Sequence, residues 1–230
     1  MNKLNMLLLA GFLAFSGCTT IMISNSVKKP AYTYLALGDS YTIGEAVPLK
    51  SSFPYQLAAQ LTASGTDVTE PKIIATTGWT TGELIEAINN SDLRSKQYDI
   101  VTLLIGVNNQ YRGQSPDTYR QEFIQLLDTA VKFAGGNKKH VFVLSIPDWG
   151  VTPFAAGRDK AQIAREIADF NLINRLETEK AGINYVDITP ISKQATNDAS
   201  LTADDGLHPS AKMYGLWVKA LAPVVNPNLK

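Results

Sequence analysis

The stretch Tyr34-Leu35-Ala36-Leu37-Gly38-Asp39-Ser40-Tyr41-Thr42-Ile43-Gly44 decides how the rest of the chain is interpreted. An apolar run ends abruptly at Gly-Asp-Ser, and Gly44 lies four residues after the serine. This pattern predicts a buried strand that enters a tight turn with a hydroxyl at its tip. A serine held there has the exposure that a nucleophile needs. Gly, Asp and Ser are also ordinary turn formers, so the tripeptide is informative only in combination with motifs later in the chain.

The overall composition suits one globular domain and excludes several classes of protein. The chain has 230 residues, of which 45% are hydrophobic and 18% charged, enough for a full core. Lys+Arg and Asp+Glu both number 21, so neither a nucleic-acid-binding surface nor an acidic tail is indicated. The single cysteine, Cys18, excludes an internal disulfide and a cysteine zinc cluster. Only His140 and His208 are available for acid–base chemistry near neutral pH.

The N-terminal segment is typical of a targeting signal. Lys3 gives it a positive start, and residues 4–15 form an almost unbroken apolar run. That run is too short for an ordinary transmembrane helix but fits the core of a secretory signal. Ser16 and Gly17 suit a peptidase site, and Cys18 resembles the lipidated cysteine of a bacterial lipobox, although Phe15 stands where such boxes usually have Leu. A plain signal peptide with an incidental cysteine is the alternative.

The lipobox resemblance divides the chain into three parts. We expect residues 1–17 to be a lipoprotein signal peptide, 18–30 a tether, and 31–230 the folded domain. Acyl chains on Cys18 would anchor the protein in the bacterial cell envelope. Thr19 rather than Asp comes after the cysteine, which in lipoproteins favours the outer membrane where the host has one.

Strand-like apolar runs alternate with helix-like segments along the folded domain. We expect strands within 32–37, 68–75, 98–105, 140–146 and 183–188, and helices over 53–63, 81–88, from 115 to the glycines at 135–136, 158–180 and 209–221. This alternation of continuous apolar strands with helices predicts an α/β fold, a three-layer α/β/α sandwich with a five-stranded parallel sheet. Ligands of such sheets bind beyond the carboxyl ends of the strands. The residues just past strand ends are Ser40, Gly78, Asn108 and Asp148, and we expect them to converge.

The loop Asp205-Gly206-Leu207-His208 supplies a candidate base. An Asp three residues before a His can reach the imidazole and hold one tautomer, which leaves the other ring nitrogen facing the serine. Asp-Gly and His-Pro are common loop pairs, so a surface turn histidine is the alternative. Asp148 is a rival partner for His208. His140 comes after two lysines at a strand start, on the opposite edge, and is interpreted as a solvated residue.

Acyl chemistry also needs donors for a developing oxyanion. The N–H groups of Ser40 and Gly78 and the side-chain amide of Asn108 are candidates. Gly78 is equally a turn glycine by its sequence, and Asn108 a capping residue. Asn109 beside it could play either part.

Four blocks, in this order, resemble the SGNH hydrolases, also called GDSL esterases and lipases. The blocks are Gly38-Asp39-Ser40, Gly78, Gly106-Val107-Asn108-Asn109 and Asp205-Gly206-Leu207-His208. The resemblance extends from about residue 31 to residue 222. It implies a flavodoxin-like sandwich and an esterase that uses no metal and no cofactor. Tyr41 stands where the family often has Leu, and Asn109 where it often has Asp; both departures affect pocket shape rather than a required donor.

By that resemblance each block contributes one part of the chemistry. Ser40 is the nucleophile, His208 the general base and then the acid, and Asp205 its orienting partner. The N–H groups of Ser40 and Gly78 and the side chain of Asn108 form the oxyanion hole.

Aromatic residues near the expected site suggest a substrate pocket. Trp79, Tyr111 and Trp149 each come after a strand end, where they either line that pocket or pack loops. We expect a lipid-anchored serine esterase that acts on short-to-medium acyl esters or lysophospholipids. The alternatives are a carbohydrate O-acetylesterase of the same family and a non-catalytic binding lipoprotein of the envelope. The expected partners are an ester substrate and a membrane, with no nucleic acid and no metal.

Overall fold

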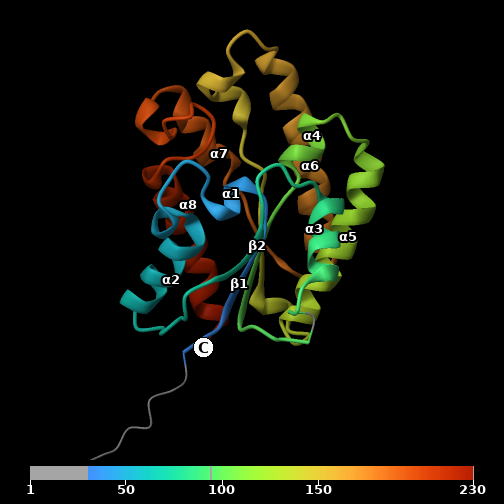
Figure 1. Cartoon of the computed structure of the whole chain (residues 1–230), viewed down its shortest axis with the longest axis vertical. Helices are drawn as coiled ribbons and strands as arrows, with labels where there is room; N and C mark the ends of the chain where they lie inside the picture. Colours follow the sequence, from blue (N-terminus) through green and yellow to red (C-terminus); the bar gives the residue numbers. More distant parts are fainter. Residues whose placement is uncertain (1–30, 94, 230) are drawn as a thin grey trace, which may run out of the picture.

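The computed structural model describes residues 31–93 and 95–229 (Figure 1). The expected signal peptide, Cys18 and the tether lie outside these residues. The strands are β1 (Tyr34–Gly38), β2 (Lys72–Ala75), β3 (Ile100–Leu104), β4 (Val141–Leu144) and β5 (Asn184–Val186). The helices are α1 (Ser40–Ile43), α2 (Phe53–Ala63), α3 (Thr81–Asn90), α4 (Val107–Tyr111), α5 (Pro116–Phe133), α6 (Lys160–Lys180), α7 (Thr189–Ser192) and α8 (Ala211–Asn228). Short 3-10 turns lie at Leu49–Ser51, Lys138–His140, Trp149–Val151, Pro153–Ala155, Lys193–Thr196 and Ala199–Leu201.

The five strands form one parallel sheet in the order β2-β1-β3-β4-β5. β1, β3 and β4 are buried along their whole length, as continuous apolar runs predict for strands covered on both faces. The predicted three-layer α/β/α sandwich is therefore confirmed. The chain switches direction across the sheet at β1 and β3, and a crevice beyond their carboxyl ends is the expected ligand position.

Helices cover both faces of the sheet (Figure 1). α2 and α8 pack against each other on one face, where the rings of Phe53 and Trp217 lie 6.4 Å apart. α3, α5 and α6 cover the other face, where Tyr119 contacts Phe123 and Phe170. Within the described part of the chain, no helix is both long and apolar enough to cross a membrane.

Local capping explains where the helices begin. α2 has the predicted bounds, and Ser115 Oγ caps α5 by accepting the N–H of Thr118 at 3.1 Å. α6 begins at Lys160, two residues after the expected start, because the Asp159 side chain accepts the N–H of Gln162 and so becomes the N-cap.

The last helix, α8, runs seven residues beyond the predicted end at Leu221. It continues past Pro223 and Pro227, although a proline inside a helix removes a backbone hydrogen bond. Ala222 and Val225 are both buried and extend the apolar stripe of α8 against the core. We infer that burial of this stripe outweighs the lost hydrogen bonds.

Candidate active site

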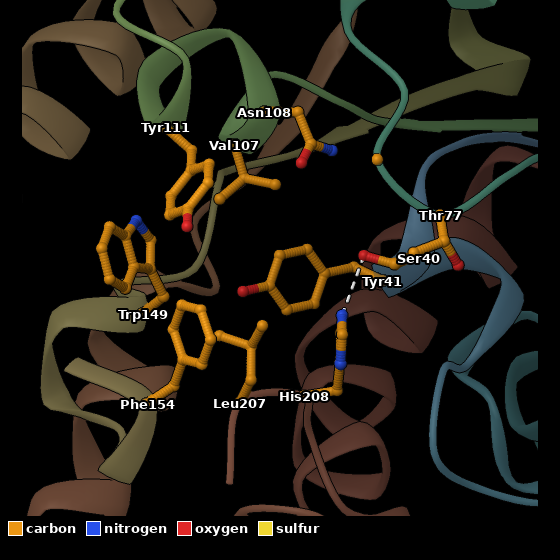
Figure 2. A pocket seen from close by; sticks show the side chains of 11 residues that line it. Ser40, Tyr41, Thr77, Val107, Asn108, Tyr111, Trp149, Phe154, Leu207 and His208 are labelled. Atoms are coloured by element: carbon orange, nitrogen blue, oxygen red, sulfur yellow. Dashed lines mark hydrogen bonds between the residues drawn. The ribbon is translucent and has the colours of Figure 1, made fainter. Parts of the chain in front are cut away.

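Segments that are distant in sequence meet beyond the carboxyl ends of the strands. Ser40 begins α1 directly after β1, Gly78 comes after β2, Asn108 lies in α4 after β3, and His208 precedes α8. These residues surround one cavity of about 170 Å³. Its lining consists of Ser40, Tyr41, Thr77, Gly78, Val107, Asn108, Tyr111, Trp149, Phe154, Leu207 and His208 (Figure 2).

A chain of hydrogen bonds connects Ser40, His208 and Asp205. Ser40 Oγ lies 3.0 Å from His208 Nε2 (Figure 2). On the other side of the ring, His208 Nδ1 lies 2.5 Å from Asp205 Oδ2. Asp205 Oδ1 also accepts the backbone N–H groups of Leu207 and His208, at 2.9 and 3.0 Å. Both Ser40 and His208 are buried. One ring nitrogen of the imidazole therefore faces a carboxylate and the other a hydroxyl.

The same contacts keep Asp205 ionised. Partial burial disfavours its carboxylate, but the hydrogen bonds from the His208 ring and from two backbone N–H groups outweigh that effect and hold the pKa of Asp205 below its usual value. Asp205 is therefore an anion at neutral pH. An anion in this position stabilises a positive charge on the imidazole.

Asp39 fixes the position of Ser40 by capping the helix that Ser40 begins. Its Oδ1 accepts the N–H of Tyr41 at 3.0 Å and caps α1, which places Ser40 in the first turn of a helix. A side chain at Gly38 is excluded, because an added Cβ would lie 2.1 Å from Thr42 Oγ1. Asp39 is buried, its Oδ2 has no hydrogen-bond partner among the described residues, and burial raises its pKa to about 7.

The expected oxyanion donors lie together along the pocket. Gly78 has a φ of 85°, a conformation that favours glycine. Asn108 Nδ2 donates to Trp79 O at 2.9 Å, and the amide carries a second N–H that can serve another acceptor. Arg112 Nη2 donates to Gly78 O at 2.5 Å, while its Nη1 contacts Glu83 at 3.2 Å. Arg112, which sequence reasoning did not single out, therefore ties the Gly78 loop to the start of α3.

Asn109 is not part of the pocket lining. It is fully buried, where its Oδ1 accepts the N–H of Thr81 at 3.1 Å and its Nδ2 donates to Thr81 Oγ1 and Gln114 Oε1. These contacts join α4 to α3. Of the two adjacent amides, Asn108 faces the cavity (Figure 2). Asn109 instead connects α4 to α3 through its hydrogen bonds with Thr81.

Among the described residues, neither of the two rival polar residues, Asp148 and His140, forms a side-chain hydrogen bond with Ser40 or His208. Asp148 Oδ1 accepts the N–H of Gly150 at 2.9 Å, and its Oδ2 lies 3.7 Å from Lys193 Nζ. Asp205, rather than Asp148, contacts His208. His140 ends a 3-10 turn before β4, at the amino edge of the sheet.

Aromatic side chains form one wall of the cavity. Tyr111, Trp149 and Phe154 pack edge to face or tilted, with ring centres 5.5–6.4 Å apart. Trp79 is not among the lining residues; it contributes its carbonyl to Asn108 instead. Sequence reasoning missed Thr77, Val107, Phe154 and Leu207 as wall residues. The signal available for Phe154 was the loop after Ile146, which is rich in Pro and Gly and comes directly after a strand end.

No candidate metal cluster accompanies these groups. Among residues 31–93 and 95–229, no set of three His, Cys, Asp or Glu side chains is arranged to hold a metal ion.

Comparison with known proteins agrees with this arrangement. The chain matches the GDSL-like Lipase/Acylhydrolase family over residues 36–216. No curated protein matches it.

Solved structures share the fold at low sequence identity. TesA superposes with a TM-score of 0.67 at 18% identity, covering 85% of this chain and 99% of TesA. The psychrotrophic esterase EstA from Pseudoalteromonas sp. gives 0.66 at 15% identity, covering 85% and 97%. The lipase/acylhydrolase from Enterococcus faecalis gives 0.64 at 21% identity, covering 86% and 97%. The family match extends over most of the described chain and includes Ser40, Gly78, Asn108 and His208, so this protein belongs to the GDSL-like lipase/acylhydrolase family of hydrolases.

Proposed function

We propose that this protein is a serine esterase that hydrolyses carboxylic esters through an acyl-enzyme. The observation that carries the proposal is the hydrogen-bonded series Ser40–His208–Asp205 beside the cavity. Ser40 Oγ attacks the ester carbonyl carbon while His208 Nε2 takes the hydroxyl proton. Asp205 stays ionised and stabilises the imidazolium. The C–O bond to the alcohol then breaks, and His208 gives its proton to the leaving oxygen.

Hydrolysis of the acyl-enzyme repeats these steps with water. His208 takes a proton from the water, the resulting hydroxide attacks the acyl carbon, and Ser40 leaves as the free hydroxyl. In both halves the carbonyl oxygen becomes negative, and we assign its stabilisation to the N–H groups of Ser40 and Gly78 and the amide of Asn108. Losing one such donor typically costs about 3–4 kcal/mol of transition-state stabilisation.

The size of the cavity favours small esters. A volume of about 170 Å³ is below the roughly 300–1,000 Å³ of typical sites for drug-sized ligands. We therefore propose short acyl esters as substrates, ahead of lysophospholipids with their longer acyl chains.

A carbohydrate O-acetylesterase is the second candidate. Tyr111 and Phe154 are 46% and 40% exposed, and exposed rings beside a small acyl site suit the apolar face of a sugar. Release of acetate from acetylated polysaccharide, faster than from p-nitrophenyl acetate, would favour this candidate. The complete series of contacts at Ser40 argues against a non-catalytic binding protein.

Hydrolysis of p-nitrophenyl esters tests the main proposal. The full-length protein in detergent is assayed with acetate, butyrate and octanoate esters, beside Ser40→Ala. We expect wild type to prefer acetate or butyrate and Ser40→Ala to lose activity on all three. Equal rates for wild type and Ser40→Ala would reject the serine mechanism.

We also propose that lipidated Cys18 anchors the protein in the bacterial envelope, in the outer membrane where the host has one. The lipobox-like sequence before Thr19 supports this. Cys18→Ser should move the protein from the membrane fraction to the soluble fraction. Unchanged membrane retention would count against the anchor.

A further inference from the structure

The tyrosine next to the nucleophile is fixed in the floor of the cavity. Tyr41 is 3% exposed. Its ring packs against the His208 ring at 5.5 Å and against the Trp217 ring at 6.2 Å. These contacts on two sides leave the ring little freedom, so the position of its hydroxyl is set before a ligand arrives.

The hydroxyl of Tyr41 points into the cavity, toward the wall made by Trp149, Phe154 and Leu207 (Figure 2). None of the residues in the described part of the chain forms a hydrogen bond with it. Two other buried tyrosines are bonded to the protein: Tyr34 Oη pairs with Thr102 Oγ1 at 3.0 Å, and Tyr119 Oη contacts Ile105 O and Asn174. Tyr214 Oη has no partner among the described residues, but it lies in the core, whereas the Tyr41 hydroxyl faces the cavity. Because the Tyr41 hydroxyl faces the cavity, a bound ligand can supply its hydrogen bond.

The surroundings of this hydroxyl are otherwise apolar. Val107, Trp149, Phe154 and Leu207 present carbon to the same space (Figure 2). The Trp149 indole N–H is already used, since it donates to Gln110 Oε1 at 2.8 Å. The Tyr111 hydroxyl lies 3.2 Å from Arg158 Nη2, which donates to it. A substrate lying along this wall therefore meets the Tyr41 hydroxyl as an unused polar group.

The phenol of Tyr41 is a neutral donor at any working pH. Burial raises its pKa well above the usual value, and the carboxylates of Asp39, Asp205 and Asp148 raise it further. A neutral phenol can donate to an ether, carbonyl or hydroxyl oxygen.

We propose that the Tyr41 hydroxyl is a specificity-determining donor that hydrogen-bonds an oxygen atom in the substrate, so that the preferred esters carry an ether, keto or hydroxyl oxygen in the part that lies along the apolar wall. This inference rests on the proposed esterase function. Its physical reason is that a hydrocarbon chain in the same place would strip water from the hydroxyl and give it no partner.

Matched ester pairs test the proposal, because replacing one CH₂ by oxygen changes polarity but hardly changes shape. One arm compares p-nitrophenyl 3-methoxypropanoate with p-nitrophenyl pentanoate and places the oxygen in the acyl part. The other compares 2-methoxyethyl acetate with butyl acetate and places it in the alcohol part. The full-length protein is assayed in detergent, and the ratio of kcat/KM, oxygen-bearing over hydrocarbon ester, is measured for wild type and for Tyr41→Phe.

Tyr41→Phe keeps the ring and its packing and removes only the hydroxyl. We expect the ratio to fall by about tenfold on one of the two arms, and that arm tells which part of the ester occupies the wall. Comparing the ratio between the two proteins cancels the intrinsic reactivity of each ester, since both proteins use the same pair. An unchanged ratio on both arms would overturn the proposal.

Two further variants separate the possible failures. Tyr111→Phe removes the other hydroxyl of the cavity; a fall in the ratio there, with none in Tyr41→Phe, would also overturn the assignment to Tyr41. Ser40→Ala sets the background for every ester. Should wild type hydrolyse no ester above that background, the proposed function itself fails and the role of Tyr41 fails with it. Hydrolysis that depends on Ser40, with the same kcat/KM ratios in wild type and Tyr41→Phe, would reject only the proposed role of Tyr41.

Discussion

The two edges of the sheet carry similar residues in different arrangements. The carboxyl edge has His208, Asp205 and a cavity of about 170 Å³; the amino edge has His140, Asp99 and a cavity of about 320 Å³. His208 contacts a carboxylate and a hydroxyl through its two ring nitrogens. In the described part of the chain no residue forms a hydrogen bond with the His140 ring. Directed contacts, rather than residue types or cavity size, therefore distinguish the candidate active site.

The carboxylates of the two edges differ in the same way. Asp99 Oδ2 accepts both the N–H and the hydroxyl of Thr33 at 2.8 Å, so it joins the start of β3 to the start of β1. Asp205 holds the ring of His208. At the carboxyl edge the strands end in loops and short helices whose side chains are available to a ligand. At the amino edge the Asp99 carboxylate instead bonds Thr33 and so connects two neighbouring strands.

Removing each histidine gives the largest expected contrast. His208→Ala should lower kcat on p-nitrophenyl butyrate by about 10,000-fold or more, because Ser40 loses its base. His140→Ala, its matched control, should leave kcat within about twofold of wild type, since His140 lies at the amino edge of the sheet, opposite the cavity beside Ser40. Steady-state kinetics of both variants measure the contrast. Comparable losses in the two would show that the edges do not differ as described.

Removing the guanidinium that bonds the Gly78 carbonyl gives a smaller effect. Arg112 bridges Gly78 O and Glu83, so Arg112→Ala should lower kcat by about tenfold with little change in KM, through a displaced Gly78 N–H. Arg175→Ala is the control, because Arg175 pairs with Glu179 on the surface of α6. Arg112→Lys should be intermediate, since an ammonium cannot bridge both acceptors in the same geometry. Wild-type kcat in Arg112→Ala would mean that the loop is held without it.

The two structural aspartates should respond to neutralisation with opposite signs. Asp39 has a native pKa of about 7 against an ordinary 3.8, so between these pH values the folded protein holds a proton that the unfolded chain has lost. Stability therefore falls as pH rises through this window, by at most about 4 kcal/mol. Asp39→Asn removes that loss and should raise Tm at pH 8 while changing it little at pH 5.

Asp99→Asn should lower Tm at both pH values, because the charged acceptor of two hydrogen bonds is lost, at a cost of about 1–2 kcal/mol. Thermal unfolding of the two variants and wild type at pH 5 and pH 8 makes the comparison. A lower Tm for Asp39→Asn at pH 8 would show that its carboxylate is stabilised by contacts rather than destabilised by burial.

Much of the fold could be predicted from local patterns. The bounds of α2 result from apolar residues at helical spacing, and the start of α5 results from its serine cap and Pro116. The expected strands were longer than the observed ladders, since an apolar run continues beyond the residues that pair with a neighbour. The short helices α1 and α4 contain too few residues to show a period, although they carry Ser40 and Asn108.

The candidate site divides in a similar way. The residues that carry the chemical groups could be predicted from the four sequence motifs, but the side chains that line the cavity wall could not. Trp79 could equally have lined the pocket or packed a loop by its sequence; it packs against the core and offers its carbonyl to Asn108. Phe154 and Leu207 line the cavity without having been expected there. Which way a loop side chain points depends on the backbone angles of its turn and on its neighbours in space, and residue type decides neither.

The sequence by itself determined the α/β alternation, the residues at the strand ends and the types of chemical group available, because hydrophobic period and turn chemistry act over a few residues. Only the tertiary structure decided that Ser40 and His208, 168 positions apart, lie 3.0 Å from each other, that Asp205 rather than Asp148 holds the imidazole, and that the Tyr41 hydroxyl points into the cavity. Such contacts depend on how α8 and its preceding loop pack across the sheet, and that packing is a property of the whole folded chain.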